Sequence, residues 1–205
     1  MNRIITISRE FGSGGRELGR LIAAKLGYAY YDKEIVSRIA ERSEMTETYV
    51  QNVLEQKPFL TLPIHVGVSL EPTADPLLMQ SQELFQLQCS ILKEVAEKSD
   101  CVIVGRCADY ILSDCHPFRI FVYAEMESRL RRCRETEGVG QDLSDRELRN
   151  QILGVDRQRS DYYEFCTGNK WSDRLNYDIC VNSTNIPLEE LAESVAMVVR
   201  ASKNS

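Results

Sequence analysis

IITISREFGSGGRELGRLIAAKL, residues 4–26, is the stretch that decides the fold. It opens on a run rich in β-branched side chains, which predicts a short buried strand. A glycine-dense turn at residues 12–15 follows, and apolar residues then recur at helical spacing from Leu18 to Leu26. Gly27 stands where a helix usually ends. The predicted local order is therefore strand, glycine loop and helix.

This glycine loop is suited to binding an anion, most often a phosphate group. Its backbone N–H groups and those at the start of the helix converge, and the helix dipole adds about half a positive charge there. The usual pattern G-x-x-x-x-G-K-S/T also supplies a lysine and a hydroxyl group. Here Gly15 stands at the lysine position, and Arg16 and Glu17 follow it. A strand-to-helix turn without a ligand is the alternative interpretation.

The composition predicts one soluble domain. The chain has 205 residues, of which 43% are hydrophobic and 27% charged, which is enough for a real core. No apolar run approaches the roughly 18 residues that would span a bilayer, so we expect a cytoplasmic protein without a membrane partner. Seven scattered cysteines and two histidines support neither a disulfide framework nor a zinc site.

The charge pattern favours a small phosphorylated ligand. A net charge of -6 argues against binding a nucleic acid polymer. The arginines nevertheless form local groups, beside the loop and within 129–134 and 157–159. Such groups predict a cleft for small-molecule nucleotides or similar ligands, whereas any single group could be a solvated helix face. A monomer and a homodimer both remain open.

Strands and helices alternate along the chain, which predicts an α/β fold with a parallel sheet. Further strands are expected at residues 28–32, 101–104, 118–124 and 177–181. Helices are expected at residues 33–42, from Asp75-Pro76 onward, at 125–137, from Ser144 with Glu147 as a capping box, and at 187–200. Ligands in such sheets bind at the carboxyl ends of the strands, which places the loop, Asp32 and Gly105-Arg106 around one crevice.

Several motifs, in order, resemble the cytidylate-kinase-like family, a branch of the P-loop nucleoside monophosphate kinases. They are SREFGSGGRE, YYD, VGRCADYIL, DRQRSDYYEFCTG and NKWSDRLNYDICVN. The resemblance covers nearly the whole chain. It implies a three-layer P-loop fold with five parallel strands in the order 2-3-1-4-5. It also implies one domain with a core of residues 1–34, 100–130 and 169–205, a helical monophosphate-binding insertion at about 35–99, and a lid at about 131–168.

The resemblance also implies roles for individual residues. The residues expected to cradle the ATP phosphates are Gly12, Ser13, Gly14, Gly15, Arg16 and Glu17. Those expected to act in catalysis are Arg16, Arg131, Arg132 and Arg159. Those expected to bind the acceptor are Asp32, Arg38, Arg106, Asp109, Asp156 and Arg157. The implied reaction is phosphorylation of CMP or dCMP by ATP with Mg²⁺.

The chain also departs from the family pattern. Lysine and hydroxyl are missing from the loop, Cys107 replaces an aspartate after Gly-Arg, and Val104 stands where an acid often occurs. Arg9 or Arg16 could replace the lysine, since a guanidinium group meets two phosphate oxygens at once. The candidate metal ligands are Glu17 and Asp109, or waters on the phosphates.

Other interpretations stay open for single residues and for the whole chain. Arg131 and Arg132 could form a salt-bridged helix surface, and Asp156 and Arg159, three residues apart, could form an intrahelical ion pair. The chain as a whole could be a P-loop kinase of another small molecule, or a nucleotide-binding protein without catalytic activity.

Overall fold

A parallel five-stranded sheet forms the centre of the molecule. The computed structural model describes residues 2–55, 76–135 and 140–202. The strands are β1 (Ile4–Arg9), β2 (Ala29–Tyr31), β3 (Cys101–Val104), β4 (Phe118–Tyr123) and β5 (Ile179–Asn182). Their order is β2-β3-β1-β4-β5, and every neighbouring pair is parallel. The predicted fold class and strand order are confirmed.

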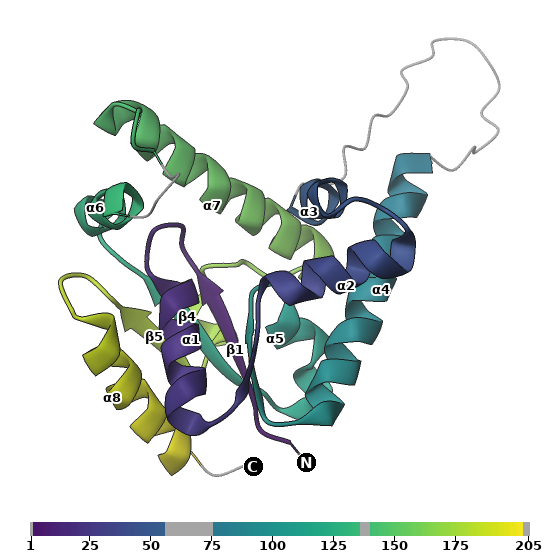
Figure 1. Cartoon of the computed structure of the whole chain (residues 1–205), viewed down its shortest axis with the longest axis horizontal. Coiled ribbons are helices and arrows are strands. Elements are labelled where there is room, and N and C mark those ends of the chain that lie inside the picture. The colour runs from purple at the N-terminus through teal and green to yellow at the C-terminus, as the bar shows by residue number, and fades with distance from the viewer. Residues whose placement is uncertain (1, 56–75, 136–139, 203–205) are drawn as a thin grey trace.

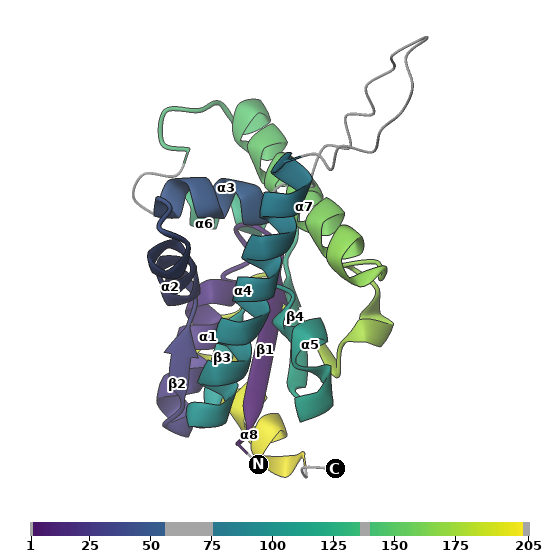
Figure 2. The same ribbon diagram turned by 90° about the vertical axis from the view of Figure 1, so that its right-hand side faces the viewer.

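Helices cover both faces of this sheet (Figure 1). One face carries α1 (Gly15–Leu26) and α8 (Leu188–Ala201), which pack against each other. Figure 2 shows α4 (Pro76–Lys98) and the short α5 (Ala108–Ile111) over the other face. The remaining helices are α2 (Lys33–Ser43), α3 (Glu47–Glu55), α6 (Met126–Glu135) and α7 (Asp145–Thr167), with single turns η1 (Ser113–Cys115) and η2 (Arg174–Asn176).

The central strands are apolar throughout because both of their faces are covered. Successive side chains of a strand point to opposite faces. Ile5 and Ile7 of β1 therefore join Leu18 of α1 in one cluster, whereas Ile4 joins Ile91 of α4 in another. All five residues are at most 3% exposed. This burial holds β1 and the start of α1 in place on either side of the glycine loop.

The ends of most elements agree with the sequence prediction, and the capping box at the start of α7 is confirmed. Ser144 Oγ accepts from the N–H of Glu147, whose carboxylate accepts from the N–H of Ser144. The sequence prediction missed α3, whose buried residues are Val50 and Leu54. Part of the predicted insertion at 35–99, residues 56–75 with the expected cap at Asp75, lies outside the described residues.

No helix in the described part of the chain is both long and apolar enough to cross a membrane.

Candidate active site

The glycine loop connects the last residue of β1 to the first residue of α1. Gly12 and Gly14 have φ of 75° and 79°, the left-handed region that favours glycine. Ser13 between them is fully buried, and its hydroxyl donates to the carbonyl oxygen of Glu10 at 2.8 Å. The first N–H groups of α1 have no acceptor within the helix and can donate to a bound anion. The loop is therefore preformed for an anion.

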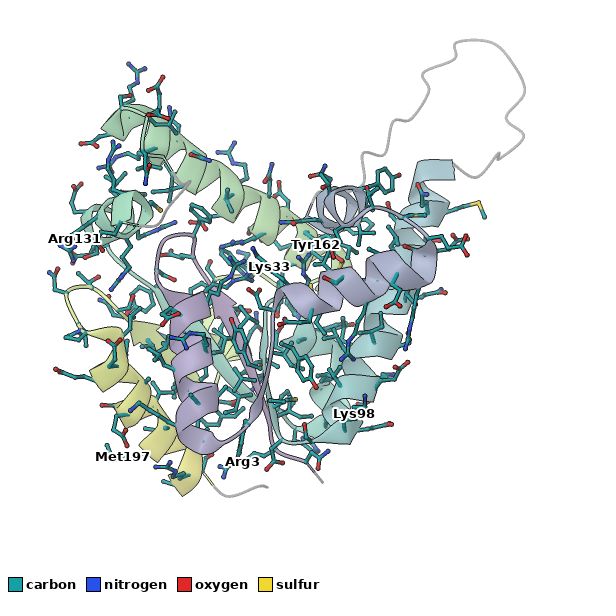
Figure 3. All side chains as sticks on the ribbon, viewed as in Figure 1. Arg3, Lys33, Lys98, Arg131, Tyr162 and Met197 are labelled. Atoms are coloured by element: carbon teal, nitrogen blue, oxygen red, sulfur yellow. The ribbon has the colours of Figure 1, made fainter. Side chains whose placement is uncertain are left out.

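A cavity of about 890 Å³ lies against this loop. The loop residues and Arg16 form one wall, and α6 forms a second. Figure 3 shows Arg131 on the side of α6 that faces the chain leading into α8. Ile186, Pro187 and Leu188 on that chain provide apolar surface at a third wall. The cavity thus combines a cationic, amide-lined part with an apolar part.

A smaller cavity of about 50 Å³ lies on the other side of Arg9. Its walls include Arg106 at the end of β3 and three aromatic side chains, Tyr162, Tyr163 and Trp171. Tyr162 lies near the middle of the molecule in Figure 3. Trp171 packs edge-on against Phe121, with ring centroids 5.3 Å apart.

Arg9 and Arg159 line both cavities. Arg159 Nη1 donates to the carbonyl oxygen of Arg9 at 3.1 Å, and its guanidinium group lies 5.5 Å from the centre of the Phe11 ring. Burial, followed by repulsion from Arg159, lowers the pKa of Arg9 to about 9, so Arg9 still carries its charge at neutral pH. Two guanidinium groups are thus held together where the two cavities meet.

Comparison with known proteins identifies the family of this chain. The model of the cytidylate kinase-like family matches residues 4–185 of the chain. The chain belongs to this family. No curated protein matches the sequence at a significant level.

The solved structures that resemble this cytidylate kinase-like chain agree on the fold. An uncharacterized protein from Eubacterium ventriosum is 24% identical, with a TM-score of 0.71, over 98% of this chain and 100% of that one. A shikimate kinase from Bacteroides thetaiotaomicron is 18% identical, with a TM-score of 0.58, over 97% and 98%. A gluconokinase from Sinorhizobium meliloti is 13% identical, with a TM-score of 0.51, over 98% and 92%. Family and fold together support a P-loop kinase.

In this member of the cytidylate kinase-like family, Arg16 and Glu17 lie at the cavity wall, and each is paired with a nearby residue. Arg16 Nε lies 2.6 Å from Asp32 Oδ2, and the Arg16 side chain remains 56% exposed. Glu17 Oε1 lies 2.5 Å from Arg20 Nη2, which lowers the pKa of Glu17. Because Asp32 already binds Arg16, the structure brings Asp32 to the phosphate loop.

The two consecutive arginines of α6 also line the larger cavity. Arg132 donates to the carbonyl oxygens of Ser13 and Ser183, and burial lowers its pKa. It thereby ties the glycine loop to the end of β5. Arg131 donates to Asn185 Oδ1 at 3.2 Å. Both residues line the cavity, Arg132 half-buried and Arg131 exposed, so a solvated surface remains an interpretation for Arg131.

Asp156 lies behind the glycine loop instead of beside the smaller cavity. Its carboxylate accepts from the N–H of Phe11 at 2.7 Å and pairs closely with Arg129 of α6. Arg129 also binds Glu10 at 3.2 Å and the carbonyl oxygen of Phe11 at 2.7 Å, and it is 4% exposed. Asp156 therefore supports the loop from below, and its distance from Arg159 is 4.0 Å.

The other predicted acceptor residues separate into two groups. Arg106 lines the smaller cavity, with a left-handed φ of 59° and its carbonyl oxygen bound to Gln88 Nε2. Arg38 of α2 lies 5.6 Å from the centre of the Tyr31 ring, and Arg157 lies on an exposed face of α7. Neither Arg38 nor Arg157 is part of the walls of the two cavities described here.

Asp109 is buried below the smaller cavity. It is 6% exposed, and its Oδ2 accepts from the Tyr163 hydroxyl at 2.6 Å. Burial raises the pKa of this carboxyl group in spite of that hydrogen bond. Its carboxylate reaches neither cavity wall, so Asp109 is poorly placed to bind a metal ion.

The raised pKa of Asp109 gives a prediction about stability. The folded state favours the protonated acid, so this group stabilises the fold below its unfolded pKa of 3.8 and loses that contribution as pH rises. Asp109→Asn should therefore be more stable than the wild type at pH 7, with a gap that closes toward pH 4. Urea unfolding at both pH values measures this gap. The exposed Asp114→Asn is the control, and an equal gap in both variants would contradict the prediction.

The conformation of Gly14 gives a second prediction. A Cβ there would have a strained φ and would lie 2.9 Å from Leu188 Cδ1. Gly27, at the other end of α1, has a similar φ of 72° but open space around its Cβ. Gly27→Ala should cost about 1 kcal/mol of strain. Gly14→Ala should lower Tm by more than Gly27→Ala does. It should also weaken ATP binding at least about tenfold, because the loop must shift to make room for the new Cβ. Equal ATP affinities in the two variants would rule this out.

Proposed function

We propose that this chain transfers the terminal phosphoryl group of ATP to a nucleoside monophosphate, with CMP or dCMP as the first candidate acceptors. The observation that carries the proposal is that Arg9 and Arg159 lie at the junction of two cavities beside a phosphate loop. Phosphoryl transfer depends mainly on positioning and on stabilising charge. Both requirements are met where two fixed cations face a donor site and an acceptor site.

The larger cavity suits ATP. Its volume of about 890 Å³ falls within the range of ordinary ligand sites. The loop amides and the start of α1 offer donors to the phosphates, and Ile186, Pro187 and Leu188 offer apolar surface to the base. Arg132 would hold the loop closed over the phosphates through Ser13.

The smaller cavity suits the phosphorylated end of the acceptor. Arg106 and Arg159 would neutralise an acceptor phosphate, and the aromatic rings of Tyr162 and Trp171 would exclude water from it. Excluding water matters because water would otherwise take the phosphoryl group. Lid closure over both sites would involve α6 and α7, which carry Arg131 and Arg159.

Magnesium would be held mainly by the phosphates of ATP. In residues 2–55, 76–135 and 140–202, no three His, Cys, Asp or Glu side chains come together to hold a metal ion. Glu17 lines the larger cavity and is the predicted ligand that could contact the ion or its waters. When bound, Mg²⁺ would neutralise charge on the phosphates.

An assay of ADP release across acceptors tests the proposal. Turnover should be higher with CMP and dCMP than with UMP, AMP, GMP and their deoxy forms. Chelation of Mg²⁺ by EDTA should abolish turnover with every acceptor. No turnover with any nucleoside monophosphate would reject the proposal. ATP binding without transfer to any acceptor would instead select the nucleotide-binding protein without catalytic activity.

A second candidate is a P-loop kinase whose acceptor is not a nucleotide. It is supported by the fold shared with a shikimate kinase and a gluconokinase, and by the small volume of about 50 Å³ beside Arg106. The acceptor panel should therefore include shikimate and gluconate. Turnover with either one, and none with nucleotides, would select this candidate.

A further inference from the structure

We propose that Arg9 performs the function of the loop lysine that this chain lacks. The inference rests on the proposed phosphoryl transfer and assigns a catalytic residue to it. The usual lysine belongs to the start of the helix that follows the loop. Arg9 instead is the last residue of β1, on the opposite side of the loop. The cation would thus be supplied from the strand and not from the helix.

Steric contacts show that Arg9 fills the space that a side chain at position 15 would need. A Cβ built on Gly15 would lie 2.5 Å from Cβ and 3.1 Å from Cγ of Arg9. Real Cβ atoms do not approach other atoms so closely, and the obstacle is the stem of Arg9, not its flexible end. A lysine at position 15 and an arginine at position 9 therefore exclude each other.

The far end of the Arg9 side chain reaches the end of β3. A Cβ built on Gly105 would overlap Arg9 Nη1, at 2.1 Å, so the guanidinium group lies directly against this glycine. The side chain thus extends from Gly15 to Gly105, which immediately precedes Arg106. The absence of a side chain at position 15 leaves room for the stem of Arg9, and its absence at position 105 leaves room for the guanidinium group.

The electrostatic surroundings of Arg9 call for an anionic ligand. Arg159, Arg106 and Arg16 all lower its pKa by repulsion, in addition to the larger effect of burial. Asp32 acts in the opposite direction, but its carboxylate lies 2.6 Å from Arg16 Nε. A terminal phosphate between the two cavities would relieve this repulsion. Repulsion among these arginines would be offset by a bound anion, because a nearby negative charge stabilises their charged forms.

The chemical step follows from this position. The P–O bond between the β-phosphate oxygen and the γ-phosphorus of ATP breaks, and a bond from an acceptor phosphate oxygen to that phosphorus forms. The electron pair of the broken bond stays on ADP. Arg9 keeps its proton and bridges oxygens of the donor, where its planar fork can stabilise the charge of the transition state.

Exchanging the residues at positions 9 and 15 tests the assignment. Arg9→Ala should lower kcat by on the order of a thousandfold, as loss of a transition-state arginine does elsewhere. Gly15→Lys alone should also be inactive, since the lysine meets the stem of Arg9. The double variant R9G/G15K restores the usual arrangement and should exceed R9G in kcat at least about tenfold. Arg9→Ala within threefold of wild type, or a double variant no better than R9G, would overturn the assignment.

A binding measurement separates this inference from the proposed function. Titration calorimetry without acceptor should show that Arg9→Ala lowers the affinity for ATP at least about tenfold. The affinity for adenosine should not change, since adenosine has no phosphate for a guanidinium group to bind. Arg174 is exposed, and Arg174→Ala removes an equal charge, so this variant should change neither the ATP affinity nor the adenosine affinity. If the wild type phosphorylates no nucleoside monophosphate, the proposed function fails, yet the ATP and adenosine affinities still decide the role of Arg9. Equal losses for ATP and adenosine would overturn it.

Discussion

Arg159→Ala is expected to reduce the rate of phosphoryl transfer by on the order of a thousandfold. The residue lines both cavities, and its guanidinium group is fixed by the carbonyl oxygen of Arg9 at 3.1 Å and by the ring of Phe11. A cation fixed before the reaction stabilises the transition state without reorganising. The loss should therefore appear in kcat more than in the KM for ATP.

Two further variants make the Arg159 prediction specific. Arg159→Lys keeps the charge but loses the planar fork, and we expect it to recover part of the rate. Arg146→Ala removes an exposed arginine from the same helix and should leave the rate unchanged. Single-turnover experiments with CMP measure the step directly. A rate for Arg159→Ala within threefold of the wild type would exclude a catalytic role.

Arg129→Met is expected to lower the free energy of unfolding by about 3–5 kcal/mol. Arg129 is 4% exposed and binds the carboxylates of both Glu10 and Asp156 as well as the Phe11 carbonyl oxygen. Its removal takes the nearest cation away from two partly buried carboxylates. The free energy of unfolding of a natural domain is only about 5–15 kcal/mol in total, so much of the fold's stability depends on these contacts of Arg129.

Urea unfolding measures the effect of Arg129→Met, with Arg42→Met as its control. Arg42 binds Glu94 through two contacts of 2.7 Å, but both side chains are more than 40% exposed. Its loss should cost at most about 1 kcal/mol. Burial already raises the pKa of Glu10, and Arg129 opposes that rise. The loss of unfolding free energy in Arg129→Met should therefore become smaller as the pH falls below 7. Equal losses of unfolding free energy in Arg129→Met and Arg42→Met would contradict the prediction.

The sequence predicts the framework of this molecule well because that framework depends on local patterns. The apolar run of β3 and the capping box of Ser144 and Glu147 are short-range signals, and both predict their elements correctly. The strand order instead came from the family resemblance. The helix α3 was missed because Val50 and Leu54 alone give a weak apolar pattern beside the exposed residues around them.

The site was harder to predict because it depends on contacts between distant residues. Spacing predicts that Asp156 pairs with Arg159 or a ligand, and the two side chains do lie 4.0 Å apart, but the closer partner of Asp156 is Arg129, 27 residues earlier. The choice between Arg9 and Arg16 depends on the space beside Gly15. One signal was nevertheless present: Arg9 occupies the first glycine position of the loop pattern, and a long side chain fits there only when position 15 lacks one.

The place of Arg9 in the chain affects how the loop can open. Arg9 pairs with Val122 in the ladder between β1 and β4, and the N–H of Glu10 donates to the Val122 carbonyl oxygen at 3.0 Å. A cation anchored in the middle strand of the sheet stays still when the turn beyond it fluctuates. Amide hydrogens around Gly12 and Gly14 can then exchange quickly with solvent while those of Arg9 and Glu10 remain protected. A nucleotide could then leave by movement of the glycine turn and of α6, which Arg132 ties to it, while the charge of Arg9 stays in position for the next one.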